Sequence, residues 1–93
     1  MKTSYRNKIM IIGDVLRVAE ESGNGINHTS LLRKTNLSHA TLCKIIANLV
    51  SAGVISEQLA RRQHVYSITI KGKDYLDRYR QFAGVSDAFG LQL

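Results

Sequence analysis

The segment from Asn27 to Gly53 constrains the fold of this chain more than any other stretch. Its apolar residues recur at helical spacing in two short series, which are separated by Asn36, a residue that favours a turn. Ser38 is a favourable N-cap for the second series, and Gly53 favours its termination. The apolar positions are Leu31, Leu32, Leu42, Ile45, Ile46, Leu49 and Val50. The pattern predicts two short helices joined by a tight turn, the second running from Ser38 to Ala52.

The outward positions at the start of that second helix are small, polar or basic. They are Ser38, His39, Thr41 and Lys44. Such side chains can donate hydrogen bonds to phosphates and base edges, as a helix in the major groove of DNA must. Arg33 and Lys34, at the end of the preceding helix, are candidates for further phosphate contacts. The segment therefore predicts a DNA-binding helix-turn-helix, against the plainer interpretation of an ordinary solvated helix face.

Beyond Gly53 the apolar period changes from helical to two. The runs Val54–Leu59 and His64–Ile70 are rich in β-branched residues and predict two short strands. Arg61 and Arg62 fall at the tip of the resulting β-hairpin, where arginine can lie along the DNA backbone or enter the minor groove. The alternative is a charged loop that keeps the hairpin soluble.

A further helix is predicted on each side of this central part. One spans Tyr5–Glu21 and is followed by the sequence Ser-Gly-Asn-Gly, and the other spans Lys71–Phe82 with Thr69 as its cap. The complete order is helix, helix, helix, strand, strand, helix. The predicted fold is thus mainly α with a small β-hairpin: a winged helix-turn-helix over residues 1–83, followed by an apolar tail over residues 84–93.

The charge balance bears on the kind of partner. The chain has 13 Lys and Arg against 7 Asp and Glu, a formal net charge of +6 and a pI near 9.8. This excess favours a polyanion such as DNA, although charge alone fits an unspecialised basic protein equally well. Cys43 is the single cysteine, which fits a reducing cytoplasm, and we expect it to be semi-buried. No apolar run approaches the roughly 18 residues that span a bilayer, so no membrane association is expected.

The sequence gives no support for catalysis or for a cofactor. His28, His39 and His64 are separated by 11 and 25 residues and lack the close pairing of zinc ligands, so no metal site is expected. Neither a glycine-rich phosphate loop nor a nucleophile motif occurs. No residues indicate a small-molecule ligand. We therefore expect a protein that is not an enzyme.

The chain resembles the small archaeal winged-helix DNA-binding proteins, a family that includes coiled-coil dimers among the chromatin-associated proteins of hot acidophilic archaea. Three stretches carry the resemblance: RNKIMIIGDVLRVAEE, TSLLRKTNLSHATLCKIIANLVSAGVI and YSITIKGKDYLDRY. The matching positions are Thr29, Leu31, Leu32, Asn36, Leu37, Ser38, Gly53, Val54 and Ile55, then Tyr66, Thr69, Lys71 and Gly72. It spans Tyr5 to Phe82. Coiled-coil members have a long final helix, whereas this one meets Gly84 early.

The resemblance implies a transcription regulator that binds double-stranded DNA. Helix 38–52 would enter the major groove, and the wing at 60–64 would lie on the backbone or in the minor groove. A homodimer is expected, with the first helix, the last helix and the apolar tail at its interface. Two alternatives remain open at this point. One is a non-specific architectural DNA-binding protein, and the other is a winged-helix module that binds another protein.

Overall fold

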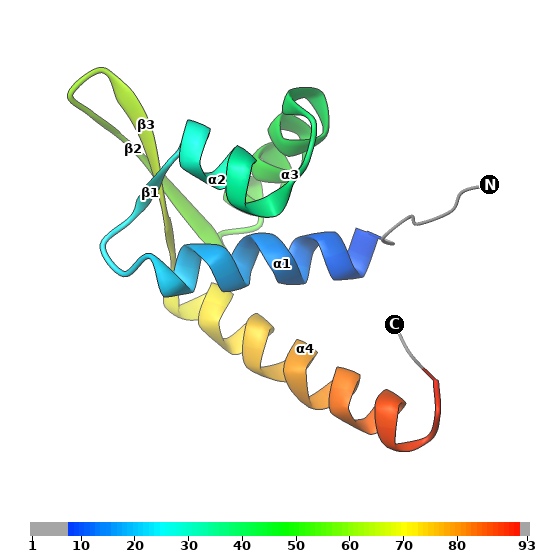
Figure 1. Ribbon diagram of the computed structural model, residues 1–93. Coiled ribbons are helices and arrows are strands. Elements are labelled where there is room, and N and C mark those ends of the chain that lie inside the picture. The colour runs from blue at the N-terminus through cyan, green and yellow to red at the C-terminus, as the bar shows by residue number, and fades with distance from the viewer. Residues whose placement is uncertain (1–7, 92–93) are drawn as a thin grey trace.

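The computed structural model describes residues 8–91, and Figure 1 shows their arrangement. The helices within this range are α1 (Lys8–Glu21), α2 (His28–Thr35), α3 (His39–Ser51) and α4 (Ile70–Ala88), and the strands are β1 (Ile26–Asn27), β2 (Ile55–Ala60) and β3 (Gln63–Ile68). This order is that of a winged helix with an added C-terminal helix, which confirms the predicted fold class. The expected first turn of the opening helix, residues 5–7, lies outside the described residues.

Side-chain caps define the helix-turn-helix. Asn27 caps α2 by accepting a hydrogen bond from the backbone N–H of Ser30 at 2.8 Å. Asn36 ends α2 in the left-handed conformation with φ of 56°, which asparagine tolerates better than most residues. Ser38 caps α3 by accepting from the N–H of Thr41 at 3.2 Å. The turn between the two helices is therefore only a few residues long, as predicted.

The sheet is antiparallel and has the order β1-β3-β2 among the described strands. In β2 and β3, Ile55 pairs with Ile68 and Ala60 with Gln63. In β1, Ile26 pairs with Tyr66. Apolar periodicity does not predict β1, because a strand of two residues is too short to show a period. This short strand ties the segment before α2 to the wing, and it thereby places the start of α2 beside the hairpin.

The core lies where α1, α2 and α3 meet the sheet. Its largest fully buried side chains are Leu16, Leu31, Leu42, Ile55, Leu76 and Val15. The helical members come from positions at helical apolar spacing, and Leu76 extends the core to α4. Burying a side chain of this size contributes about 1.5–3 kcal/mol. The core therefore joins the helix-turn-helix to α1 and to the sheet.

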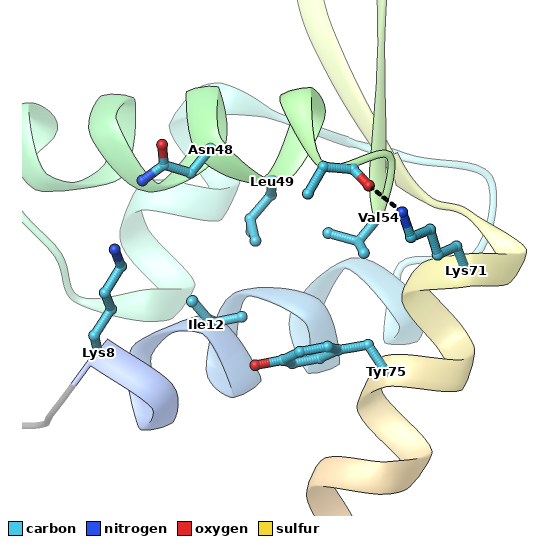
Figure 2. Close-up of a pocket in the computed structure, with 8 residues that line it drawn as sticks. Lys8, Ile12, Asn48, Leu49, Val54, Lys71 and Tyr75 are labelled. Carbon is cyan, nitrogen blue, oxygen red and sulfur yellow. Dashed lines mark hydrogen bonds between the residues drawn. The ribbon is translucent and has the colours of Figure 1, made fainter.

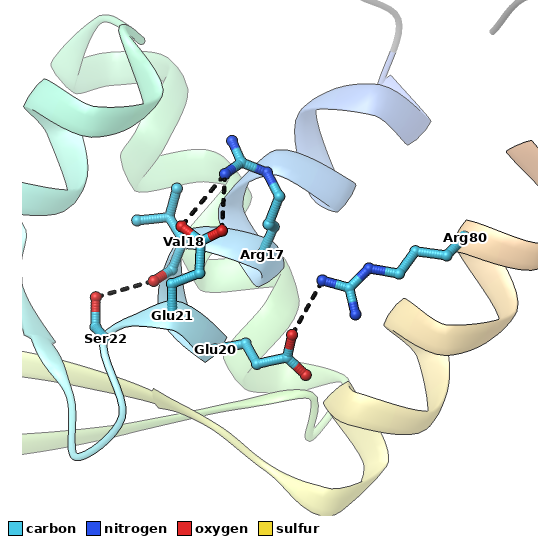
Figure 3. A network of polar contacts seen from close by, with 6 residues as sticks. All are labelled: Arg17, Val18, Glu20, Glu21, Ser22 and Arg80. Atoms are coloured by element: carbon cyan, nitrogen blue, oxygen red, sulfur yellow. Dashed lines mark hydrogen bonds and ion pairs between the residues drawn. The ribbon is translucent and has the colours of Figure 1, made fainter.

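The last helix is longer than predicted. It runs through the exposed Gly84 to Ala88 rather than ending near Phe82, and Gly90 follows with φ of 75°. A helical glycine costs only about 1 kcal/mol relative to alanine, which is too little to end a helix by itself. Figure 3 shows one tie to the body of the molecule, an ion pair at 3.0 Å from Arg80 on α4 to Glu20 on α1.

None of the helices described within residues 8–91 combines the length and the apolar character that crossing a bilayer requires.

Candidate nucleic-acid interface

The exposed face of α3 carries two of the residues that the sequence predicted for the interface. His39 and Lys44 are exposed, and Leu42, Ile45, Ile46 and Leu49 are buried on the opposite face. The sequence predicted a semi-buried Cys43, whereas the structure shows its side chain exposed. The exposed face also includes Ala40, Ala47 and Asn48. Its N-terminal half is therefore a shallow surface of small side chains with one imidazole, one thiol and one ammonium group.

Ser38 and Thr41 act first on the helix itself. Besides capping the N–H of Thr41, the Ser38 hydroxyl donates to the Thr41 hydroxyl at 2.9 Å. Thr41 is half-buried, while Ser38 is exposed. The pair fixes the first turn of α3 and holds both hydroxyls in defined positions.

The wing tip has an unusual backbone. Arg61 and Arg62 have φ of 52° and 67° and form the two-residue connection between the paired residues Ala60 and Gln63. Positive φ at both central residues is the geometry of a type I′ turn, for which Asn-Gly is the favoured sequence. A non-glycine residue in such a conformation carries a cost of order 1–3 kcal/mol. Two exposed arginines therefore occupy turn positions in which asparagine and glycine are conformationally favoured.

A hollow of about 160 Å³ lies between the wing and the start of α2. Its lining consists of Asn27, His28, Thr29, Arg62, Gln63 and His64. The first turn of α2 directs its N–H groups toward this end of the helix, and Arg62 adds a positive charge. The sequence could not predict this hollow, because β1 brings together residues more than thirty positions apart, such as Ile26 and Tyr66. Arg33 and Lys34 are exposed at the other end of α2.

A chain of polar contacts joins α2, α3 and the sheet. His28 Nδ1 lies 3.3 Å from the Tyr66 hydroxyl, and His28 Nε2 lies 3.1 Å from His39 Nδ1. His39 Nε2 in turn lies 3.5 Å from Cys43 Sγ. Burial lowers the pKa of His28, and the neighbouring His39 and His64 lower it further, which favours the neutral imidazole. The same burial, reinforced by Glu57, raises the pKa of Tyr66.

On the wing, His64 is engaged with an acidic neighbour. Its Nδ1 lies 2.6 Å from Glu57 Oε2, across the β2–β3 pair. Glu57 pairs in register with Tyr66, and His64 pairs with Leu59. His64 thus contacts an acidic side chain of its own hairpin, whereas His28 and His39 contact each other.

A second hollow is apolar and lies away from the wing. It has a volume of about 370 Å³ and opens between α1, α3 and α4, where Ile12, Leu49 and Tyr75 line it (Figure 2). At its margin the Lys71 ammonium donates to the Ala52 carbonyl at 2.8 Å and so caps the end of α3. The junction of three helices creates this groove, so no local sequence pattern predicts it.

Comparison with known proteins agrees with this architecture. Sso10a-2, a DNA-binding protein from Sulfolobus solfataricus, is similar in structure with a TM-score of 0.82 and 21% identity over 90% of this chain and 85% of that chain. A winged-helix DNA-binding protein from STIV has a TM-score of 0.71 and 20% identity over 85% and 90% of the two chains. A MarR-family transcriptional regulator from Rhodococcus sp. RHA1 also has a TM-score of 0.71, with 20% identity over 85% of this chain and 59% of that chain.

Comparison at the level of sequence gives the family. No curated protein is significantly similar to this chain. The model of the winged helix-turn-helix family, however, matches residues 5–86, nearly the whole chain. The chain belongs to the winged helix-turn-helix family.

Proposed function

We propose that this protein binds double-stranded DNA as a transcription regulator, with α3 in the major groove and the wing on the adjacent backbone or in the minor groove. The observation that carries the proposal is the wing tip, where Arg61 and Arg62 both hold positive φ. Both residues are exposed, so no packing in the core explains their presence. A strained cationic turn is explained if its charges act on a polyanion.

The arrangement of the elements supports the same conclusion. In Figure 1 the wing, α2 and α3 lie on one side of α1, and α4 lies on the other. Lys44 on α3 and Arg62 beside the start of α2 therefore belong to one half of the molecule. The net charge of +6 adds a long-range attraction for the phosphate backbone. Ser38, His39 and Thr41 would supply hydrogen bonds at the groove, and Arg33 and Lys34 further phosphate contacts.

The similar structures point in the same direction. Sso10a-2 and the STIV protein are described as DNA-binding, and the Rhodococcus protein as a transcriptional regulator. Because their identity to this chain is near 20%, they contribute the fold, and the proposal depends on the charges and the wing of this chain. A cytoplasmic location and the absence of enzymatic activity stay predictions.

An architectural role is the second candidate, and the face of α3 favours it in one respect. Ala40 and Ala47 are exposed there and offer no hydrogen bond to a base edge. A face with few side chains that hydrogen-bond to bases discriminates weakly between DNA sequences, because each good base contact contributes about 1–3 kcal/mol. The two roles are separated by the ratio of affinities for selected and random duplexes rather than by affinity itself.

A double variant of the wing tests DNA binding. We expect Arg61→Asn/Arg62→Gly to raise the melting temperature, since Asn-Gly relieves the strained turn. The same variant is expected to bind a labelled random duplex more weakly and to reduce the slope of log affinity against log salt by up to about 1.8, the value for two lost phosphate contacts. Fluorescence anisotropy across a salt series measures the second effect, and thermal unfolding the first.

The matched control removes two positive charges from α4. Lys73→Gln/Arg78→Gln has the same net charge as the wing variant, and both residues are exposed on the far side of α1. We expect its salt slope to stay close to that of the wild type. Equal weakening by both variants would show that net charge, and not the wing, drives binding. No binding by the wild type at low salt would refute the DNA proposal and favour a module that binds another protein.

A further inference from the structure

The N-termini of α2 and α3 bring together a set of side chains that the sequence keeps apart. One ligand atom each from His28, His39 and Cys43 lies within 4.8 Å of the others. His39 and Cys43 are one helical turn apart on α3, so both project from the same face. His28 reaches them from the first residue of α2. The group is thus held by the helix-turn-helix itself, and not by a mobile loop.

Two arrangements of protons, opposite in direction, satisfy the contacts within the group. In one of them the Cys43 thiol donates to His39 Nε2, His39 Nδ1–H donates to His28 Nε2, and His28 Nδ1–H donates to the Tyr66 hydroxyl. Each acceptor then has one donor. In this arrangement Nε2 of both histidines carries its lone pair and points into the group. Two imidazole nitrogens and a thiol are soft and borderline ligands of the kind that zinc selects.

A second feature is typical of metal-binding histidines. Such a histidine usually donates its other ring N–H to a fixed acceptor, which sets its tautomer and its orientation. Tyr66 occupies that position behind His28, at 3.3 Å from Nδ1. Tyr66 is itself 5% exposed and belongs to the core. The acceptor is therefore a fixed part of the sheet, and the His28 ring is oriented before any ligand arrives.

We propose that His28, His39 and Cys43 form a zinc-binding site, with the fourth tetrahedral position left to water. With Zn–N near 2.0–2.1 Å and Zn–S near 2.3 Å, the two nitrogens and the sulfur of a tetrahedral site lie roughly 3.3–3.6 Å apart, so the group must contract by about 1 Å. His39 and Cys43 are exposed and can rotate to achieve this. Binding releases the Cys43 thiol proton to solvent and replaces the two contacts that His39 makes. The contact from His28 to Tyr66 is kept.

The site links two elements at the point where they approach the proposed DNA surface. Zinc bound there would clip the start of α2 to the start of α3, and a thiolate-bound Zn²⁺ ion would add one net positive charge. The residues that bind the metal are all within the chain, so one ion per chain is expected. The proposal does not depend on DNA binding, because the ligands are present in the protein alone.

Cobalt is the spectroscopic probe. Untagged protein is freed of metal with a chelator and titrated with Co²⁺ under reducing conditions. We expect a thiolate-to-cobalt charge-transfer band in the near ultraviolet, intense visible bands of a four-coordinate ion, saturation at one equivalent, and loss of these bands when Zn²⁺ displaces the cobalt. Cys43→Ser is expected to lose the charge-transfer band. His39→Ala and Tyr66→Phe are expected to weaken zinc binding about tenfold or more, Tyr66→Phe because it removes the acceptor behind His28.

The third histidine provides the matched control. His64 lies on the wing and pairs with Glu57, so His64→Gln is expected to bind cobalt as the wild type does. Circular dichroism confirms that each variant is folded before titration. The proposal is overturned if the wild type shows no charge-transfer band at micromolar to millimolar Co²⁺, if Cys43→Ser keeps the band, or if His64→Gln loses it. Saturation at half an equivalent would also overturn it, since the metal would then bridge two chains.

Discussion

At the residue scale, the glycines of α4 show how one residue type serves opposite purposes. A Cβ at Gly72 would lie 2.1 Å from the Val54 carbonyl oxygen and 2.7 Å from Ile68 Cγ1. The backbone of α4 can approach the start of β2 only because that side chain is absent. A Cβ at Gly84 would meet nothing within 4 Å. Gly72 is therefore required by packing, whereas Gly84 only weakens the helix.

Alanine substitutions at these two positions should change stability in opposite directions. We expect Gly72→Ala to lower the free energy of unfolding by at least about 2 kcal/mol, because a backbone carbonyl cannot move aside as a side chain can. Gly84→Ala should raise it by about 0.5–1 kcal/mol through helix propensity. Urea denaturation followed by circular dichroism measures both. Equal effects of the two substitutions would contradict the close approach at Gly72.

At the element scale, α1 and α4 are held together by an aromatic ring as well as by the Arg80 ion pair. The ring of Tyr79 lies against Gly13, where an added Cβ would be 2.6 Å from Tyr79 Cε2. In the sequence, Gly13 only interrupts an apolar run. In the structure, the absence of a side chain at Gly13 allows the ring of Tyr79 to lie between the two helices. Burial raises the pKa of the Tyr79 hydroxyl, and Asp14 and Tyr75 raise it further.

This shift predicts how stability depends on alkaline pH. Below the ordinary tyrosine pKa of 10.0, Tyr79 is neutral in both the folded and the unfolded chain. As the pH rises above that value, the unfolded chain loses the proton first, so folding stability falls. We expect Tyr79→Phe to be less sensitive than the wild type between about pH 9.5 and 11. Urea denaturation across this range tests it, and a Tyr79→Phe variant with the same pH dependence as the wild type would contradict it.

At the scale of the whole molecule, the far end of α4 carries an apolar stripe that the body does not cover. Phe82, Val85 and Phe89 are 54%, 57% and 77% exposed and follow one another at helical spacing. We propose that a second copy of the chain covers this stripe. The homodimer expected from the sequence would then form through α4, on the side of the molecule away from the wing. Such a dimer would present two α3 helices to half-sites along one duplex.

A double variant tests this interface. Phe82→Glu/Phe89→Glu should convert a dimer into a monomer, because two carboxylates would face apolar side chains across the contact. Sedimentation equilibrium at micromolar concentrations measures the association. Ile70→Glu, at an exposed apolar position at the other end of α4, should leave it unchanged. A wild-type chain that stays monomeric would rule out the homodimer, and DNA binding by single chains would then be tested separately.

Much of this architecture could be predicted from local pattern. The apolar spacing around Leu42 and Ile45, the cap at Ser38 and the left-handed Asn36 all act within about one helical turn of themselves. The change of period after Gly53 predicted the wing, and Arg61 and Arg62 at its tip followed from the length of the two strands. The exposed face of α3 followed from the same spacing, with the exposed Cys43 as the exception.

Local sequence is thus sufficient to predict the helix-turn-helix, the wing and the positive charge, because caps, periodicity and composition depend on near neighbours. The packing of the folded chain accounts for the remaining features. It paired Ile26 with Tyr66, carried α4 past Gly84, and brought His28 to His39 and Cys43. These features depend on contacts between segments that are distant in sequence. Such contacts form only when the elements pack around a common core, and no local pattern records which side chains that packing brings together.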